Sequence, residues 1–189
     1  MALLRQIDSR RAYRALDTKP IAREVLLRLA QAAHLAPSCN NNQPWRIVTV
    51  IEPARLEALK ASLTPGNYWA RKAPAIVAFV TQLDWDARLD GGRDYALFDL
   101  GQAVMAYQLQ AVEEGLYVHP IAGFNPSIAK AVLDIPETAI LETLVILGHP
   151  GDPSGLNEKH QAAEKAPRSR KPLENVASFD AWNDRLLPR

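Results

Sequence analysis

Two groups of arginines stand near opposite ends of this 189-residue sequence. The first comprises Arg10, Arg11 and Arg14, and the second comprises Arg168 and Arg170. Guanidinium groups present fixed N–H donors that match phosphate oxygens, so a cluster of them can clamp an anion through bidentate contacts. Taken alone, each group is more typical of a solvated basic surface. The arginines therefore need a second feature before they indicate a phosphate site.

The polar loop at 36–45 supplies that feature. It reads Ala-Pro-Ser-Cys-Asn-Asn-Asn-Gln-Pro-Trp and lies between a predicted helix and a predicted strand, where ligand loops are commonly built. Its serine, asparagine and glutamine side chains combine donors with acceptors, as the edge of a heterocycle with carbonyl and N–H groups requires. An ordinary turn needs far fewer such residues. We therefore interpret the loop as a binding site for a heterocyclic ligand.

A third segment, His-Pro-Ile-Ala-Gly-Phe at 119–124, predicts a turn whose backbone N–H groups can face a ligand. Alone it is a weak indication, because proline and glycine after a strand are ordinary turn residues. The four histidines stand at positions 34, 119, 149 and 160, and none has metal-ligand spacing. We interpret His34 as a partly buried helix residue, and His119 and His149 as turn residues before prolines.

The sequence carries none of the common catalytic motifs. The glycine-rich patterns of dinucleotide-binding folds and phosphate loops are missing, and so is the Gly-x-Ser-x-Gly pattern of α/β-hydrolases. Few side-chain acids, bases or nucleophiles converge in any segment. An enzymatic interpretation therefore requires a cofactor that carries the reaction itself.

Composition narrows the class of protein further. The chain is 48% hydrophobic, which fits one globular domain with a real core. With 22 basic and 21 acidic residues it lacks the basic excess that a nucleic-acid-binding protein usually has. Its single cysteine, Cys39, allows no intrachain disulfide and no cysteine zinc site. There is no signal-peptide pattern and no apolar run of membrane-spanning length, so we expect a soluble, cytoplasmic protein that binds no metal.

Alternating helix and strand patterns must position these residues. Hydrophobic periodicity predicts helices at 20–35, 54–62, 95–115 and 127–133. Runs rich in β-branched residues predict strands at 46–51, 75–81, 116–121 and 139–147. The helix at 95–115 is apolar nearly all round, which indicates packing against another subunit as well as against its own sheet.

After residue 150 the composition becomes polar and charged, and 151–189 is predicted to be an extended tail that cannot fold alone. It carries one late apolar cluster at near-helical spacing, formed by Phe179, Trp182, Leu186 and Leu187. Such a tail should lie on its own body or on that of a partner.

Six segments, in this order and spacing, resemble the nitroreductase family of FMN-dependent enzymes. They are the Arg-Arg-x-x-Arg stretch from Arg10, the loop at 37–45, Asp99-Leu-Gly-Gln-Ala, Gly115 to Phe124, Leu147-Gly-His-Pro, and Arg168-Ser-Arg-Lys-Pro-Leu. The resemblance implies an α+β nitroreductase-like fold with a central, mostly antiparallel sheet flanked by helices. It also implies a domain-swapped homodimer built from one domain, 1–189. The core would span about 8–150, and the tail at 151–189 would complete the FMN site and pack on the partner.

The resemblance also implies a site in which the flavin carries the chemistry and no side chain is catalytic. Both arginine groups would meet the FMN phosphate and ribityl chain, and the 38–43 loop would come from the other subunit. The backbone N–H of Ala122 would point at flavin N5. The residues implied to bind FMN are Arg10, Arg11, Arg14, Pro37, Ser38, Cys39, Asn41, Gln43, Pro120, Ile121, Ala122, Gly123, Arg168 and Arg170.

The implied activity is ping-pong transfer of two electrons from NAD(P)H to a small organic acceptor, such as a nitroaromatic, a quinone, or an activated enal or carbonyl. The alternative is a protein of the same fold that stores or senses FMN without turnover. The sequence departs from many relatives at Ala12, where a serine is common, and at Ala122, where an acidic residue is common. The stretch between Trp69 and Tyr95 also lacks a long insertion that would form a lid.

Overall fold

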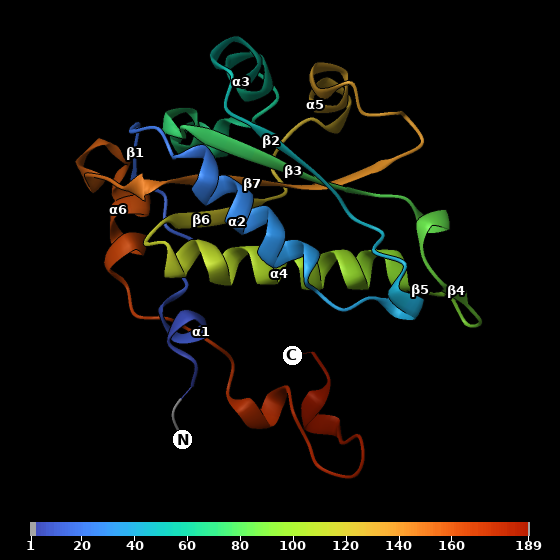
Figure 1. The fold of residues 1–189 in the computed structure, drawn as a ribbon. Coiled ribbons are helices and arrows are strands. Elements are labelled where there is room, and N and C mark those ends of the chain that lie inside the picture. Colours follow the sequence, from blue (N-terminus) through green and yellow to red (C-terminus); the bar gives the residue numbers. More distant parts are fainter. Residues whose placement is uncertain (1–2, 189) are drawn as a thin grey trace.

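The computed structural model describes residues 3–188 and contains a five-stranded antiparallel sheet (Figure 1). Its strands are β1 (Leu16–Asp17), β2 (Arg46–Val50), β3 (Ala75–Thr81), β6 (Tyr117–Ile121) and β7 (Ile140–Pro150). β7 pairs with three of the others: β3 and β6 run along it, and β1 pairs with its last two residues. β2 extends the sheet beyond β3. The predicted α+β class with an antiparallel sheet is confirmed.

Helices cover both faces of the sheet: α2 (Arg23–His34) and α4 (Tyr95–Glu113) lie on one face, and α3 (Pro53–Lys60) and α5 (Pro126–Leu133) on the other (Figure 1). The residues of β3 explain this arrangement, because all seven are buried. Alternate residues beginning with Ile76 enter the core shared with α3 and α5. The others, beginning with Ala75, enter the core shared with α2 and α4. A strand that is apolar on both faces therefore needs a layer of helices on each side.

The long helix α4 carries apolar residues on its buried face and also on its exposed face. One face, which includes Leu100 and Tyr107, is buried against the sheet and α2. On the other face Leu97, Phe98 and Met105 are exposed, and the Phe98 side chain is 62% accessible. Helix α4 was predicted to be buried nearly all round, but within a single chain one of its faces remains exposed. No helix within residues 3–188, α4 included, is both long and apolar enough to cross a membrane.

All eight predicted helices and strands are present, with shifts at their ends. The helix predicted from Pro20 begins at Arg23, because Ile21 is buried in the core and the backbone at Ala22 is still extended. Elements that the periodicity did not predict are all short. Besides several 3₁₀ turns, they are β1, α1 (Arg5–Ser9), the hairpin of β4 (Arg88–Leu89) with β5 (Arg93–Asp94), and α6 (Glu158–Lys165).

Both histidines interpreted as turn residues lie in strands, and for His119 this agrees with the strand predicted at 116–121. His119 is the middle residue of β6, and His149 belongs to β7, where it pairs with Asp17 of β1. The proline after each histidine had indicated a strand end. β6 is an edge strand that pairs only with β7, so it tolerates Pro120, which has no N–H to donate. His34, predicted to be partly buried, is exposed.

The tail has two parts. The first returns to the body, where Leu156 is buried and α6 lies beside the N-terminal segment (Figure 1). The second, 171–188, extends away from the body with only short turns at Leu173–Asn175 and Asp184–Leu186. Its apolar residues are not covered by its own chain: Phe179 is 95% exposed and Trp182 is 68% exposed.

Candidate functional site

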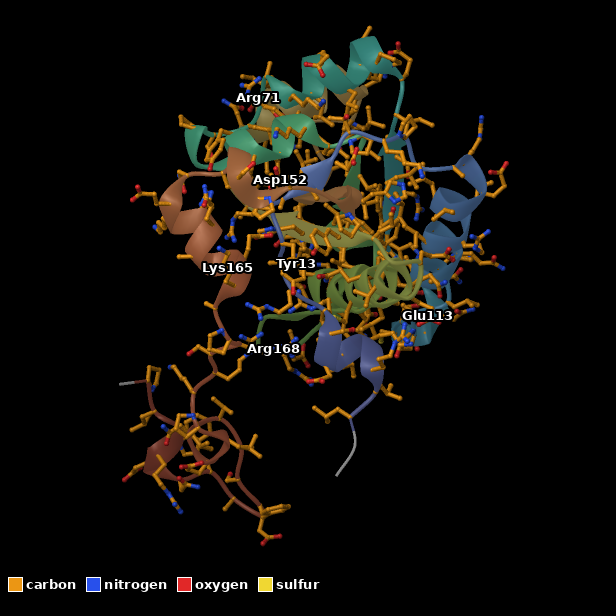
Figure 2. The ribbon with its side chains drawn as sticks, turned by 90° about the vertical axis from the view of Figure 1, so that its left-hand side faces the viewer. Tyr13, Arg71, Glu113, Asp152, Lys165 and Arg168 are labelled. Carbon is orange, nitrogen blue, oxygen red and sulfur yellow. The ribbon has the colours of Figure 1, made fainter. Side chains whose placement is uncertain are left out.

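The two arginine groups meet in one cavity of about 290 Å³ at the point where the tail leaves the body. Its walls are the N-terminal segment at 10–14 and the segment at 163–170, which comprises the end of α6 and the residues after it. Figure 2 shows Arg168 at this junction, beside α1. Residues about 155 positions apart in the sequence therefore line one pocket, which we call the arginine pocket.

Two of these arginines tie the walls together. The Arg168 guanidinium donates to the backbone carbonyls of Asp8 at 2.6 Å, Arg10 at 2.6 Å and Ile7 at 3.2 Å. From the opposite wall, Arg11 Nη2 donates to the carbonyl of Ala166 at 2.6 Å. These bonds fix the tail against the N-terminal segment, so Arg168 and Arg11 hold the shape of the arginine pocket.

The other arginines leave positive charge in the pocket without a counter-charge. Arg170 is exposed, and its side chain donates only to the neighbouring carbonyl of Ser169. Partial burial, together with the charges of Arg168 and Arg170, lowers the pKa of Arg10. Across residues 3–188, none of the five pocket arginines forms an ion pair with a carboxylate. Like charges gathered in this way favour a bound anion, and guanidinium donors suit a phosphate.

A carboxylate of α6 binds the backbone of this segment and forms no ion pair with its arginines. Glu164 of α6 accepts the backbone N–H of Arg14 at 2.9 Å and that of Ala15 at 3.3 Å. It therefore positions the N-terminal backbone and leaves the Arg14 side chain free of an ion pair. The Arg14 guanidinium lies over the Trp69 ring, 5.9 Å from its centroid.

The chain just after Arg14 is fixed by the docking of β1 beside Gly151. The Gly151 N–H donates to the carbonyl of Ala15 at 2.8 Å. A Cβ at Gly151 would overlap the backbone of Leu16 and would lie 2.6 Å from the nitrogen of Asp17. The close approach therefore requires glycine at this position.

Aromatic stacking joins the N-terminal segment to β6. Tyr13 stacks on Tyr117 with ring centroids 4.2 Å apart, and His119 stacks on Trp69 at 4.6 Å. His119 Nδ1 is 3.2 Å from the carbonyl of Tyr13, so the neutral ring donates its Nδ1–H there. Burial lowers the pKa of His119 to about 4, and the positive charges of Arg14 and Arg10 act in the same direction.

The depressed pKa of His119 predicts acid-sensitive stability. Unfolded His119 takes up a proton near pH 6.5, whereas the folded form stays neutral until about pH 4. Its contribution is therefore present above pH 6.5 and is lost as the pH falls towards 4. We expect the free energy of unfolding to drop by up to about 3 kcal/mol from this group over that range.

Urea unfolding of the wild type and of His119→Asn between pH 7 and pH 4 checks this expectation. The asparagine amide keeps a donor for Tyr13 but cannot titrate, so the variant should lose that part of the pH dependence. His34→Asn, at an exposed histidine, is the matched control and should keep it. An unchanged pH slope in His119→Asn would show that another group is responsible.

The turn after β6 is held by hydrogen bonds to Thr64 and Asn67. The carbonyl of Gly123 accepts three bonds, from Thr64 N at 3.0 Å, Thr64 Oγ1 at 2.9 Å and Asn67 Nδ2 at 2.8 Å. A Cβ at Gly123 would lie 2.5 Å from Asn67 Nδ2, so a side chain here would displace the amide that binds the turn. Ala122 is exposed, and its N–H donates to no acceptor within the part of the chain that the structure describes.

The predicted heterocycle loop has a constrained backbone. Residues Cys39–Asn41 form one turn of 3₁₀-helix, and Asn40, Asn41 and Gln43 all have positive φ. Ser38 Oγ accepts the N–H of Gln43 at 2.9 Å, which closes the loop on itself. Pro37 and residues 40–42 are exposed at the surface. Ser38, Cys39 and Gln43 are partly buried.

Two acidic residues that the sequence analysis did not single out for the site hold this loop. Asp99 Oδ2 accepts the N–H of Cys39 at 2.7 Å, and Asp86 Oδ1 accepts Asn42 Nδ2 at 3.1 Å. Asp99 belongs to a segment used for the family resemblance, but an isolated acid gives no local sign that it binds a distant loop. Asp86 carried no signal at all.

A single chain does not bring all three segments together. The loop is attached near the start of α4, through Asp99. Arg11 and Tyr13 line a cavity with Val112 at the other end of the same helix. With a rise of about 1.5 Å per residue, these two points on α4 are roughly 20 Å apart. The arginine pocket and the loop thus lie towards opposite ends of α4 within one chain.

An antiparallel sheet between two helical layers, together with an arginine-lined pocket, defines an α+β protein with a candidate anion site. Comparison with known proteins gives the family. The model of the nitroreductase family matches residues 7–65 and 53–149, which together cover more than half of the sequence. The chain belongs to the nitroreductase family.

Individual relatives have consistent descriptions. An NADH dehydrogenase of Thermus thermophilus is 31% identical over 197 residues, which cover 88% of this chain and 90% of the relative. An NAD(P)H FMN reductase of Bacillus subtilis is 24% identical, covering 80% of this chain and 67% of the relative. A crystal structure of an FMN-containing oxidoreductase superposes with a TM-score of 0.86 at 28% identity, covering 97% of this chain and 94% of that one.

Proposed function

We propose that this protein is an FMN-dependent oxidoreductase that takes two electrons from NAD(P)H and passes them to a small organic acceptor. Nitroaromatics, quinones, and activated enals or carbonyls are the proposed acceptor classes, used in a ping-pong cycle. The observation that carries the proposal is the arginine pocket, in which unpaired guanidinium groups from both ends of the chain converge. FMN, when bound, supplies hydride transfer, so the chain needs to supply position and charge.

The proposed roles of the residues follow from their contacts. Arg10 and Arg170 have free donors for the phosphate, with Arg14 beside them, while Arg168 and Arg11 keep the pocket in shape. The free N–H of Ala122, on a turn held by three bonds to the next carbonyl, suits a flavin ring atom such as N5. No side chain is proposed as an acid, a base or a metal ligand.

We further propose that two copies of the chain build each site, with the 38–43 loop coming from the partner subunit. Three observations support this arrangement. The loop and the arginine pocket lie at opposite ends of α4 in one chain. The outer face of α4 exposes Leu97 and Phe98, and the tail exposes Phe179 and Trp182. Apolar surface of this extent on a helix and on an arm is typical of surfaces that pair.

Anaerobic reduction of the protein-bound flavin by NADPH and by NADH tests the proposed activity. We expect at least one donor to bleach the bound flavin much faster than it bleaches free FMN. Subsequent addition of a quinone or a nitroaromatic should restore the colour. If neither donor reduces the bound flavin faster than free FMN, the proposal fails. Fast reduction with no acceptor turnover would indicate an FMN-storing or sensing protein.

A further inference from the structure

A buried side chain of α4 grips the loop that the proposed function assigns to the flavin. Asp99 is 1% exposed, and its Oδ2 atom accepts the backbone N–H of Cys39 at 2.7 Å. Its other oxygen, Oδ1, accepts Nε2 of Gln102 at 2.8 Å. Gln102 lies three residues further along α4, so this second bond fixes the orientation of the carboxyl group. The loop is therefore bound to a side chain that is itself held in place.

The bond to Asp99 satisfies an amide that the loop leaves without a partner of its own. Cys39 begins the 3₁₀ turn Cys39–Asn41, and the first N–H groups of a helical turn have no acceptor inside it. A serine before such a turn commonly binds one of these amides, but Ser38 forms no cap. Its Oγ accepts the N–H of Gln43 at 2.9 Å instead. Ser38 thus closes the loop on itself, and Asp99 fastens the closed loop to α4.

The backbone that Asp99 holds is strained. Three loop residues have positive φ: Asn40 at 49°, Gln43 at 50° and Asn41 at 57°. Asparagine tolerates this region better than most residues do, but it is uncommon for glutamine. Strained conformations persist only where surrounding contacts hold them. From outside the loop, the bond from Asn42 Nδ2 to Asp86 Oδ1 at 3.1 Å adds a second anchor to that from Asp99.

The same stretch of α4 faces the proposed partner subunit. Leu97 and Phe98 directly precede Asp99 and expose their side chains on the outer face of the helix, whereas Asp99 is buried and binds the loop. Because one helical turn is fixed by its internal hydrogen bonds, Asp99 ties the position of the loop to the surface that pairs. In the proposed two-chain site, this loop completes the arginine pocket of the partner subunit.

We propose that Asp99 is a positioning residue, which holds the 38–43 loop in shape for the flavin bound by the other subunit. With the bond to Cys39 in place, the loop is already formed when FMN arrives, so binding does not have to order it. Without that bond the strained turn relaxes, and FMN binding has to restore it. The flavin readout rests on the proposed function, whereas the anchoring is a property of the chain alone.

Alkylation of Cys39 in flavin-free protein tests the anchoring, because Cys39 is the only cysteine. Asp99→Leu has a side chain of similar size without an acceptor, and it should raise the rate of alkylation by iodoacetamide about tenfold. In Asp99→Asn the amide oxygen still accepts the Cys39 N–H, so the rate should stay near that of the wild type. Gln108→Leu replaces another buried polar residue of α4, and this control should leave the rate unchanged.

Amide hydrogen exchange of the flavin-free wild type gives a second measurement, which decides the question even if Asp99→Leu does not fold. After correction for intrinsic rates, the N–H of Cys39 should exchange at least about tenfold more slowly than that of Asn40. Within residues 3–188, the Asn40 N–H donates to no acceptor. Equal exchange at the two amides, or equal alkylation of wild type and Asp99→Leu, overturns the anchoring.

FMN titration tests the effect on the flavin. Asp99→Leu should raise the dissociation constant of FMN about tenfold, Asp99→Asn should recover most of the affinity, and Gln108→Leu should not change it. If Asp99→Leu exposes Cys39 but binds FMN with wild-type affinity, the positioning role is refuted. If Cys39 behaves as expected in a wild-type protein that takes up no FMN, the proposed function fails and the anchoring stands.

A mixed dimer tests whether Asp99 acts on the flavin of the other subunit. One chain carries Asp99→Leu, and the other carries Arg10→Ala and Arg170→Ala. If the loop of one chain completes the pocket of the other, both defects fall in one site, and the second site should bind FMN with wild-type affinity. If Asp99 acts within its own chain, each site carries a defect and no site of wild-type affinity is found, which overturns the action across subunits.

Discussion

Replacing Arg10 with alanine is expected to weaken FMN binding by about 100-fold while leaving the flavin-free protein at least as stable as the wild type. Hydrogen bonds between guanidinium and phosphate are charge-assisted and contribute about 1.5–3 kcal/mol each when one partner is removed. Without FMN, Arg10 is partly buried against the charges of Arg168 and Arg170, which lower its pKa. Its removal therefore relieves repulsion in the empty pocket. Flavin fluorescence titration and thermal melting measure the two effects.

Variants of other arginines separate binding from folding. Arg168→Ala should lower both affinity and melting temperature, because Arg168 donates to three backbone carbonyls that join the tail to the N-terminal segment. Arg170→Ala should lower affinity alone, because its side chain reaches only Ser169. Arg71→Ala, at an exposed arginine remote from the pocket in Figure 2, should change neither. If Arg10→Ala binds FMN with wild-type affinity, Arg10 does not contact the flavin.

Mixed dimers are expected to recover flavin that neither parent protein binds. One parent carries Arg10→Ala and Arg170→Ala in the pocket, and the other carries Ser38→Ala and Gln43→Ala in the loop. In a symmetric dimer with shared sites, the mixed form has one site with both defects and one site that is intact. A purified mixed dimer should therefore bind about one FMN, compared with none for either parent.

Absorbance of the bound flavin, measured on dimers isolated with two different affinity tags, gives this ratio directly. If each chain formed its own complete site, every site in the mixed dimer would carry a defect and no flavin would be recovered. That outcome would refute the shared site. A mixture of one parent with itself, refolded in the same way, controls for recovery caused by refolding alone.

The main elements of the fold could be predicted because their periodicity is strong. β3 is buried on both faces and reads as a continuous apolar run, and α4 is long and rich in alanine and leucine. The short elements could not be predicted, because distant contacts create them. β1 exists through its pairing with the end of β7, and α6 is held because its Glu164 accepts hydrogen bonds from the N-terminal backbone.

The site was predictable to a smaller extent. Each arginine group alone resembled a solvated surface, and only the family resemblance placed both on one phosphate; their convergence in one cavity supports that assignment. The anchoring role of Asp99 lay outside the reach of sequence patterns, because its bond to Cys39 joins residues 60 positions apart. His149 was misplaced for a local reason: the following proline indicated a strand end, but β7 continues through both residues, where β1 pairs with them.

If two copies of the chain build each site, as proposed, the separation of the loop and the arginine pocket along α4 makes FMN retention depend on protein concentration. If neither subunit alone holds a complete site, FMN binds the paired form in preference to the separate chains. Each flavin then strengthens subunit association by the factor by which its concentration exceeds its dissociation constant. Dilution should therefore release flavin and subunits together, at a protein concentration that falls as free FMN rises. The flavin supply of the cell would set the fraction of the enzyme that is assembled.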